Sequence, residues 1–215
     1  SLPIIIKENG NSFYINWEEG QKTGFYIDQR DNRKLLQRYV NGKTVLNMFC
    51  YTGAFSVYAA KGGADKVISV DSSAEAIQLV HKNLELNQID AKYNEPIKEE
   101  AITYLNNMPK DYFDLIILDP PAFAKSIDAR HNAIKGYKRI NSVAIEKIKH
   151  NGIIFTFSCS QAVSPSQFEG AIMSAAIEQG RKIRILHRLT QATCHAPSLF
   201  HPEGYYLKGL VLLVE

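Results

Sequence analysis

The sequence predicts an α/β fold, a doubly wound and mostly parallel seven-stranded sheet with a small N-terminal β appendage. Three observations predict this class. From residue 45 onward, short apolar runs alternate with segments of helical periodicity, as in a βαβ chain. The run 113–119 is rich in apolar residues and ends in an acid, which is typical of a parallel strand buried on both faces. The last two runs, 182–189 and 205–214, predict an antiparallel pair at the edge of the sheet.

The N-terminal part of the chain differs from the rest. Runs at 4–7 and 12–17 predict two strands around a tight turn, and residues 24–27 predict a third strand. The segment is too short to hold a core of its own. We therefore expect residues 1–33 to form a β-hairpin appendage and residues 34–215 to form the main domain.

The helices of the main domain are marked by their capping residues. Ser72, with Glu75 three positions later, predicts a capping box that opens a helix reaching about Asn87. Ser164, with Gln167, predicts a second box, which has a proline at the first helical position. The other expected strands are at 45–49, 66–71, 91–97 and 152–157. The other expected helices are one at 54–60, a short one that ends near residue 105, and one that includes residues 140–148.

Composition excludes several classes of protein. The 215 residues are 45% hydrophobic and 22% charged, as in an ordinary globular domain. No apolar run approaches the roughly 18 residues of a membrane span, and the N-terminus lacks the pattern of a signal peptide. Three widely spaced cysteines argue against a disulfide framework and for a reducing cytoplasm. We expect a cytoplasmic protein that does not bind membranes. Its sequence is compatible with either a monomer or a homodimer.

The first candidate site is the loop after the strand 45–49, because ligands of an open α/β sheet bind beyond the carboxyl ends of its strands. The helix behind this loop presents backbone N–H groups to an anion. Asp71, at the end of the next strand, is placed to accept the hydroxyls of a ribose, with Ser72 beside it. The alternative is a carboxylate that merely starts a helix, but Ser72 already provides that cap. The loop residues that we expect at the cofactor are Phe49, Tyr51, Thr52 and Gly53.

The same loop distinguishes between adenosine cofactors. A dinucleotide site normally shows Gly-x-Gly-x-x-Gly, because a pyrophosphate needs close approach of the backbone. This loop has one glycine, Gly53, and Tyr51 and Thr52 occupy the space that a pyrophosphate would need. A single carboxylate, such as the methionine tail of S-adenosylmethionine, fits better. The loop therefore favours a methyl donor over the cofactor of a dehydrogenase.

A second candidate site follows the strand 113–119. Pro120 and Pro121 fix the backbone and remove its donors, which leaves carbonyl groups facing the site. Asp119 and these carbonyls can accept hydrogen bonds from a planar, nitrogen-bearing ring, and Phe123 can stack on it, as expected for a flipped base. The alternative is a rigid turn that only ends the strand. The acid before the prolines and the aromatic after them favour base binding.

Cys159 follows the strand 152–157 and is the candidate nucleophile. Carbon 5 of a pyrimidine is a poor nucleophile, but a thiolate that adds to carbon 6 makes carbon 5 enamine-like. After methyl transfer a base removes the proton and the thiol leaves. Taken alone, a packed structural cysteine is an equally good interpretation. We interpret Cys50 as a packing residue, and the surroundings of Cys194 match no metal-site spacing, so no metal is expected.

Basic residues follow the second site. Between Lys125 and Lys149 the cations outnumber the acids, and Tyr137 is interleaved among them. This pattern predicts a rim that contacts the phosphates of RNA. A solvated helix face is an equally good interpretation of the charges alone.

Together these motifs resemble the bacterial 23S rRNA cytosine-5 methyltransferase family, whose full-length members begin with a PUA domain. The resemblance covers nearly the whole chain and is carried by the segments 20–25, 28–33, 47–55, 70–73, 119–123, 137–141, 158–160 and 206–209. It implies the Rossmann-like fold of class I methyltransferases, S-adenosylmethionine as cofactor and 23S rRNA as partner. No PUA domain is recognisable in these residues, and we expect the sequence to start inside a longer protein.

Carried over to this chain, the resemblance implies that Cys159 is the nucleophile and that Asp119 faces both methyl donor and base. Glu100 stands where the family often has an aspartate beside the adenine. The segment Asp28-Gln29-Arg30 is expected to fold over the mouth of the site, which makes Asp28 a candidate for the base that removes the carbon-5 proton. The residues that match the family's cofactor pocket are Phe49, Tyr51, Gly53 and Asp71.

Three alternatives differ in chemistry. A sister family of similar fold methylates a guanine nitrogen of the same RNA, but it has asparagines instead of a cysteine after the corresponding strand. Ser158-Cys159-Ser160 therefore favours carbon methylation. A planar amide of a protein or a small molecule is a further target that the Asp-Pro-Pro loop can hold. A cofactor-binding module without catalysis is the third alternative.

Overall fold

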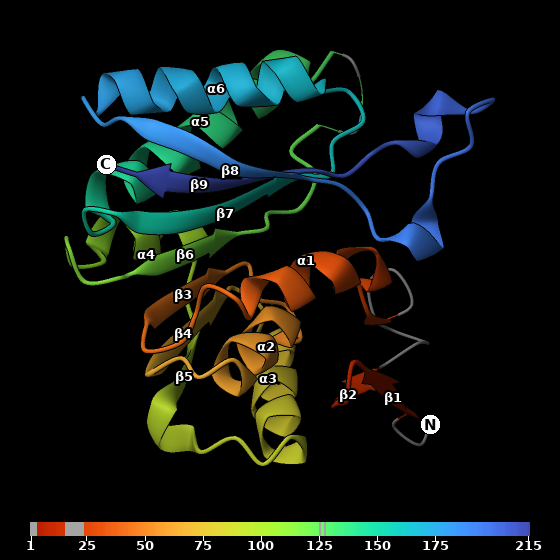
Figure 1. Ribbon diagram of the computed structural model, residues 1–215, viewed down its shortest axis with the longest axis vertical. Coiled ribbons are helices and arrows are strands. Elements are labelled where there is room, and N and C mark those ends of the chain that lie inside the picture. The colour runs from red at the N-terminus through yellow and green to blue at the C-terminus, as the bar shows by residue number, and fades with distance from the viewer. Residues whose placement is uncertain (1–3, 16–23, 125, 127) are drawn as a thin grey trace.

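The structure is a computed structural model that describes residues 4–15, 24–124, 126 and 128–215 (Figure 1). Within these residues a seven-stranded sheet has the order β5-β4-β3-β6-β7-β9-β8, and a separate two-stranded sheet is formed by β1 and β2. Neighbouring strands from β5 to β7 are parallel, whereas β9 runs antiparallel to both β7 and β8. The predicted fold class, with its β appendage, is confirmed.

Strands and helices alternate along the main domain. The strands are β1 (Ile4–Glu8), β2 (Asn11–Ile15), β3 (Thr44–Met48), β4 (Lys66–Asp71), β5 (Asn94–Lys98), β6 (Leu115–Leu118), β7 (Gly152–Ser158), β8 (Ile183–Leu189) and β9 (Lys208–Val214). The α-helices are α1 (Arg30–Leu36), α2 (Ala54–Lys61), α3 (Ala74–Leu86), α4 (Ala101–Asn107), α5 (Arg130–Lys147) and α6 (Pro165–Glu178). Short 3-10 helices are η2 (Ile27–Gln29), η3 (Ala91–Tyr93), η4 (Thr193–His195) and η5 (Pro202–Gly204).

Both faces of the sheet are covered, which explains why its central strands are apolar at successive positions. In β6, Leu115 and Ile117 pack in one cluster with residues of α1 and α2. Ile116 and Leu118 pack in another cluster with residues of α4, α5 and α6. Figure 1 shows α5 and α6 next to each other above β7, β8 and β9. The carboxyl ends of the parallel strands therefore meet at one edge, where the loops that follow them form the candidate site. No helix in the described ranges is both long and apolar enough to cross a membrane.

Several side-chain hydrogen bonds join the β1–β2 hairpin to the main domain, among them those of Asn83 and Glu8. Asn83 in α3 accepts the Tyr14 N–H at 2.8 Å and donates to the Thr52 carbonyl at 2.8 Å. Glu8 forms two contacts of 2.8 Å with the Arg33 guanidinium in α1. The hairpin is thus joined both to α1 and to the loop before α2. Because α1 runs across residue 33, the division of the chain at that position stays a prediction.

The strand expected at 24–27 is absent from the described residues. Gly24 has a φ of +86°, and the chain then enters η2. The Arg33 guanidinium donates to the Tyr26 carbonyl at 2.9 Å and lies 4.7 Å over the centre of the Phe25 ring. A side chain therefore takes the hydrogen bond that a neighbouring strand would otherwise supply. Of the strand expected at 12–17, residues 16 and 17 lie outside the described part of the chain.

The two predicted capping boxes have different outcomes. The box of Ser164 and Gln167 at the start of α6 is confirmed, with both of its reciprocal bonds formed. The Ser72 cap is wrong by one residue, because the hydroxyl that accepts a backbone N–H at the start of α3, that of Ala76 at 3.2 Å, belongs to Ser73.

Candidate active site

The loop between β3 and α2 has an unusual backbone. Phe49, Tyr51 and Gly53 adopt φ values of +57°, +47° and +76°, the left-handed region that side chains other than glycine rarely enter. The Tyr51 N–H donates to Asp71 Oδ2 at 2.9 Å, and the Gly53 N–H donates to the Cys50 carbonyl at 2.8 Å. The surrounding structure thus holds a strained loop in place, a feature that is common at ligand-binding sites.

Asp71, the last residue of β4, links two loops at this edge. Its Oδ2 accepts the Tyr51 N–H and its Oδ1 accepts the Ser73 N–H at 3.0 Å. Each carboxylate oxygen can accept more than one hydrogen bond. The backbone therefore positions the group while leaving it capacity for the hydroxyls of a ribose. Ser72 is exposed beside it.

The first turn of α2 is suited to an anionic group. Gly53 is the N-cap, and no side chain from the described part of the chain caps the helix there. The first backbone N–H groups of a helix have no partner within it, and they favour negative charge. Thr52 is buried and anchored through its carbonyl to Asn83. The role of this turn in holding a carboxylate stays a prediction.

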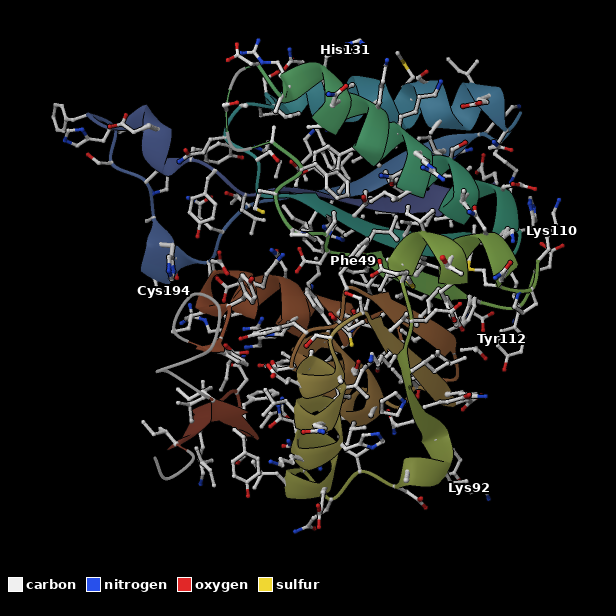
Figure 2. The ribbon with its side chains drawn as sticks, turned by 180° about the vertical axis from the view of Figure 1, so that it is seen from behind. Phe49, Lys92, Lys110, Tyr112, His131 and Cys194 are labelled. Carbon is white, nitrogen blue, oxygen red and sulfur yellow. The ribbon has the colours of Figure 1, made fainter. Side chains whose placement is uncertain are left out.

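The remaining residues expected at the cofactor lie around this loop. Figure 2 shows Phe49 near the middle of the molecule, where it packs half-buried against the core beneath α4, α5 and α6. Glu100 is exposed at the N-cap of α4, after β5. Cys50 is buried, and its burial together with the nearby Asp71 raises the pKa of its thiol well above the usual value. A protonated, packed thiol agrees with the structural role expected of Cys50.

Asp119 directly follows β6, which pairs with β3 on the side opposite β4. Its side chain is half-buried, Pro120 is buried and Pro121 is exposed. The Phe123 ring lies 4.8 Å from the ring of Tyr137 in α5. Phe123 is thus packed against α5, which limits the part of its ring that a base can contact.

Cys159 follows β7, and hydrogen bonds of the next residue, Ser160, anchor this loop to three other segments. The Ser160 hydroxyl pairs with the Tyr137 hydroxyl at 2.8 Å and accepts the Ala124 N–H at 3.3 Å. The Ser160 carbonyl accepts a hydrogen bond from Lys208 Nζ at 2.7 Å. Tyr137 is fully buried, so it supports this loop from inside the protein rather than facing solvent. The half-buried Cys159 is held next to the loop that follows β6.

Residues from both ends of the described chain complete the site. The Tyr206 hydroxyl donates to Asp28 Oδ2 at 2.7 Å across 178 positions of sequence. Burial raises the pKa of Tyr26 to about 12, with contributions from Asp119, Cys159 and Asp28. Burial, the bond to Asp28 and the charge of Cys159 raise the pKa of Tyr206 as well. Tyr26 therefore interacts electrostatically with Asp119, Cys159 and Asp28.

Gln29 and Arg30 are engaged within the protein. Gln29 is buried and accepts the Asn32 amide at 2.7 Å. Arg30 donates to the Thr193 hydroxyl at 3.2 Å, which joins α1 to the arm between β8 and β9. This arm projects from the sheet in Figure 1, and Figure 2 shows Cys194 on it, away from Phe49. Lys125, which was expected to contact substrate, lies outside the described residues.

Part of the basic stretch on α5 is used inside the fold. Lys138 pairs with Glu178 at 3.2 Å, and Lys149 pairs with Asp114 at 2.9 Å. Lys147 donates to backbone carbonyl groups at the end of α4. These contacts leave a smaller cationic rim for phosphates than the sequence alone indicates.

Tyr26, Tyr206 and Lys208 surround Cys159 but were not given roles from the sequence. Lys208 carried a usable signal, because it opens a strand that is otherwise apolar, Lys208–Val214. Tyr206 belonged only to the segment 206–209 of the family resemblance, and Tyr26 carried no signal, since their positions depend on contacts between distant segments.

Known proteins are similar to this chain in sequence. The sequence model of a family described as S-adenosylmethionine-dependent methyltransferase matches residues 3–196. A protein of Aeromonas hydrophila named ribosomal RNA large subunit methyltransferase I is 43% identical over 213 residues, which are 98% of this chain and 54% of that protein. The chain therefore spans about half the length of the curated relatives that it matches.

Solved structures share the fold. A SAM-dependent methyltransferase from Streptococcus mutans aligns with a TM-score of 0.87 at 29% identity, over 98% of this chain and 55% of that chain. A methyltransferase crystallised as a complex with SAH also aligns with a TM-score of 0.87 at 29% identity, over 98% of this chain and 56% of that chain.

These findings correct the family assignment made from the motifs. That resemblance was to a PUA-containing cytosine-5 methyltransferase family. The matching family is instead described by its dependence on S-adenosylmethionine, and the relative is named for the large ribosomal RNA. Neither description specifies carbon 5 of cytosine or a PUA domain, so the broader family replaces the narrower one.

Proposed function

Because the chain belongs to the S-adenosylmethionine-dependent methyltransferase family, we propose that it methylates ribosomal RNA of the large subunit, on carbon 5 of a cytosine. The name shared by its relatives supports the choice of RNA. The choice of atom rests on one observation, the position of Cys159 beside the loop that begins with Asp119. Methylation of a nitrogen has no use for a thiol at this place. The proposed compartment is the cytoplasm, where ribosomal RNA is found.

The proposed cofactor site uses the loops after β3, β4 and β5. The first turn of α2, behind Gly53, would hold the methionine carboxylate. Asp71 would accept the ribose hydroxyls, and Phe49 and Glu100 would border the adenine. When bound, the cofactor supplies an electrophilic methyl group.

The proposed chemistry begins at Cys159. Its thiolate forms a bond to carbon 6 of the base, and the electron pair of the carbon 5–carbon 6 double bond moves to carbon 5. Asp119 and the carbonyls of its loop accept hydrogen bonds from the amino group of the cytosine and fix the ring. After carbon 5 is methylated, a base takes its proton, the double bond re-forms and the bond from carbon 6 to Cys159 breaks, which restores the thiolate.

Asp28 is the proposed acceptor of the carbon-5 proton. It is a buried carboxylate that receives a hydrogen bond from Tyr206, and Tyr206 also interacts electrostatically with Cys159. An acidic group is thus close to the nucleophile without belonging to the same segment of chain. General bases act through such direct or water-mediated contacts.

The test supplies labelled methyl donor and unmodified large-subunit ribosomal RNA to the wild type, to Cys159→Ala and to Cys194→Ala. Cys194 is exposed on the projecting arm and controls for the loss of a thiol. We expect label on carbon 5 of cytosine, lost by about 10³-fold or more in Cys159→Ala, as for removal of a catalytic nucleophile, and retained in Cys194→Ala. RNA containing 5-fluorocytidine should in addition trap a covalent adduct on Cys159, because fluorine cannot leave as a proton does.

Other results of this experiment would support one of the alternative functions. Label on a guanine nitrogen that persists in Cys159→Ala would replace carbon methylation by nitrogen methylation. Binding of the cofactor without transfer to any RNA would favour a module that lacks catalysis.

A further inference from the structure

Lys208 is an unusually placed cation. It is the first residue of β9, where it pairs in antiparallel register with Ser158, the residue before Cys159. It is 5% exposed, although lysine is almost never this buried unless it is paired. Its Nζ donates to the Ser160 carbonyl at 2.7 Å, so the ammonium group lies beside the backbone that carries the cysteine.

Cys159 acts electrostatically on this group. Burial lowers the pKa of Lys208 overall, and the electrostatic interaction with Cys159 offsets part of that effect. Within the described ranges no carboxylate forms an ion pair with Lys208. A buried charge is costly without a partner, and an apolar side chain would fill the same volume. A lysine is therefore an unusual choice for a side chain that only fills space at this position.

The tyrosines and carboxylates around Cys159 bring no positive charge to its thiol. Tyr26 from the segment before η2, Tyr137 from α5 and Tyr206 from the segment before β9 interact with it, and burial raises the pKa of all three. They are therefore neutral near neutral pH. The carboxylates of this region, Asp28 and Asp119, act on Tyr26 and carry negative charge, which opposes ionisation of a nearby thiol. Lys208 is a positively charged group that interacts with Cys159.

We propose that Lys208 is a positioning residue whose ammonium group stabilises the thiolate form of Cys159. The thiol proton leaves to solvent, and the thiolate stays next to the cation until it attacks. The proposal rests on the proposed function only in assigning that thiolate to a cytosine. It supplies what the cysteine mechanism requires, since the thiolate and not the thiol is the nucleophile.

The experiment follows the alkylation of Cys159 by iodoacetamide as a function of pH, with mass spectrometry of the Cys159 peptide as readout. Lys208→Gln keeps a donor for the Ser160 carbonyl but removes the charge, whereas Lys208→Arg keeps the charge. Lys66→Met, at the start of β4, removes the same charge from a surface pair with Glu95 and controls for net charge. Alkylation requires neither RNA nor cofactor, so it is independent of the methylation test.

We expect the midpoint of the alkylation profile to rise by about one pH unit in Lys208→Gln, as for loss of an adjacent opposite charge. Alkylation at about pH 7 then slows about tenfold. Lys208→Arg and Lys66→Met should keep the wild-type midpoint. Coincident profiles for the wild type and a folded Lys208→Gln would overturn the proposal. If Lys208→Gln does not fold by circular dichroism, Lys208→Met is compared in the same way.

The two proposals can fail separately. A shifted midpoint in Lys208→Gln together with persistent methylation by Cys159→Ala would leave the ion pair standing and remove the nucleophile. An unshifted midpoint together with loss of methylation in Cys159→Ala would leave the nucleophile standing and remove the role of Lys208.

Discussion

Replacing Glu8 by glutamine tests how the hairpin is attached to the rest of the protein. Glu8 and Arg33 are 7% and 1% exposed, and two contacts of 2.8 Å join their side chains. The Tyr58 hydroxyl also donates to Glu8 Oε1, at 2.9 Å. Glu8→Gln keeps the size and one acceptor but leaves the guanidinium without a countercharge. Breaking a buried pair in this way lowers the free energy of unfolding by about 3–5 kcal/mol, and because one acceptor is retained we expect a loss of about 3 kcal/mol.

The matched control is a pair with similar geometry on the surface. Arg188 donates to both carboxylate oxygens of Glu169, at 2.8 and 3.2 Å, but the two side chains are 66% and 33% exposed. Glu169→Gln should cost at most about 1 kcal/mol, because water screens an exposed pair. The measurement is urea unfolding with the slope compared between variants, so that a change in midpoint reports stability.

A double replacement separates desolvation from attraction. Glu8→Leu combined with Arg33→Met removes both charges, so it should be less destabilising than Glu8→Gln alone. Equal losses for Glu8→Gln and Glu169→Gln would refute the reasoning, since burial would then make no difference. Arg33 also donates to the Tyr26 carbonyl. Arg33→Met removes this hydrogen bond and should therefore loosen Tyr26 at the site.

Two further outcomes are expected. Gly53→Ala should lose about 1–2 kcal/mol of stability and also methyl-donor affinity by calorimetry, because its φ is +76° and the new Cβ would lie 2.9 Å from Val80 Cγ1. Gly10→Ala is the control, because Gly10 has a φ of +85° but no atom lies within 4 Å of the new Cβ, so this variant has the backbone strain without the close contact. Unchanged affinity of Gly53→Ala for the methyl donor would contradict the role of the turn at Gly53. Burial raises the pKa of Asp114, but bonds from a backbone N–H and from Lys149 outweigh it and lower the pKa overall. The stabilisation that ionised Asp114 provides is thus present above the unfolded pKa of about 4 and is lost as pH falls through the lower folded pKa. The loss of unfolding free energy caused by Asp114→Asn, measured by urea unfolding, should therefore shrink from about pH 6 to about pH 3. A loss that does not change with pH would contradict this role of the Asp114 carboxylate.

Much of the fold could be predicted because its signals are local. Apolar runs mark the strands, and Ser164 with Gln167 marks the start of α6 through contacts three residues apart. The Ser72 prediction was wrong by one residue, because two adjacent serines can both serve as a cap and the local pattern does not choose between them. The strand predicted at 24–27 failed for a non-local reason, the bond from Arg33 to the Tyr26 carbonyl.

Some residues of the candidate site could likewise be predicted from local signals, and others could not. Asp71 ends one parallel strand, and Asp119 and Cys159 directly follow two others, so their placement at one edge of the sheet follows from the strand pattern. Tyr26 and Tyr206 reach the site from segments whose positions depend on the tertiary structure. Neighbouring residues in the sequence carry no record of such contacts.

The position of β9 affects the order in which the site can be assembled. Although it is the last strand of the chain, β9 lies between β7 and β8, so β8 joins the sheet only when β9 is in place. The cofactor half of the site, around Gly53 and Asp71, is built from consecutive βα units that can form while later residues are still being synthesised. On the proposed role of Lys208, Cys159 then stays a protonated thiol until β9 has been synthesised and has paired with β7. The nascent protein would therefore gain its reactivity toward oxidants and alkylating agents, which follows thiolate character, only when β9 has joined the sheet.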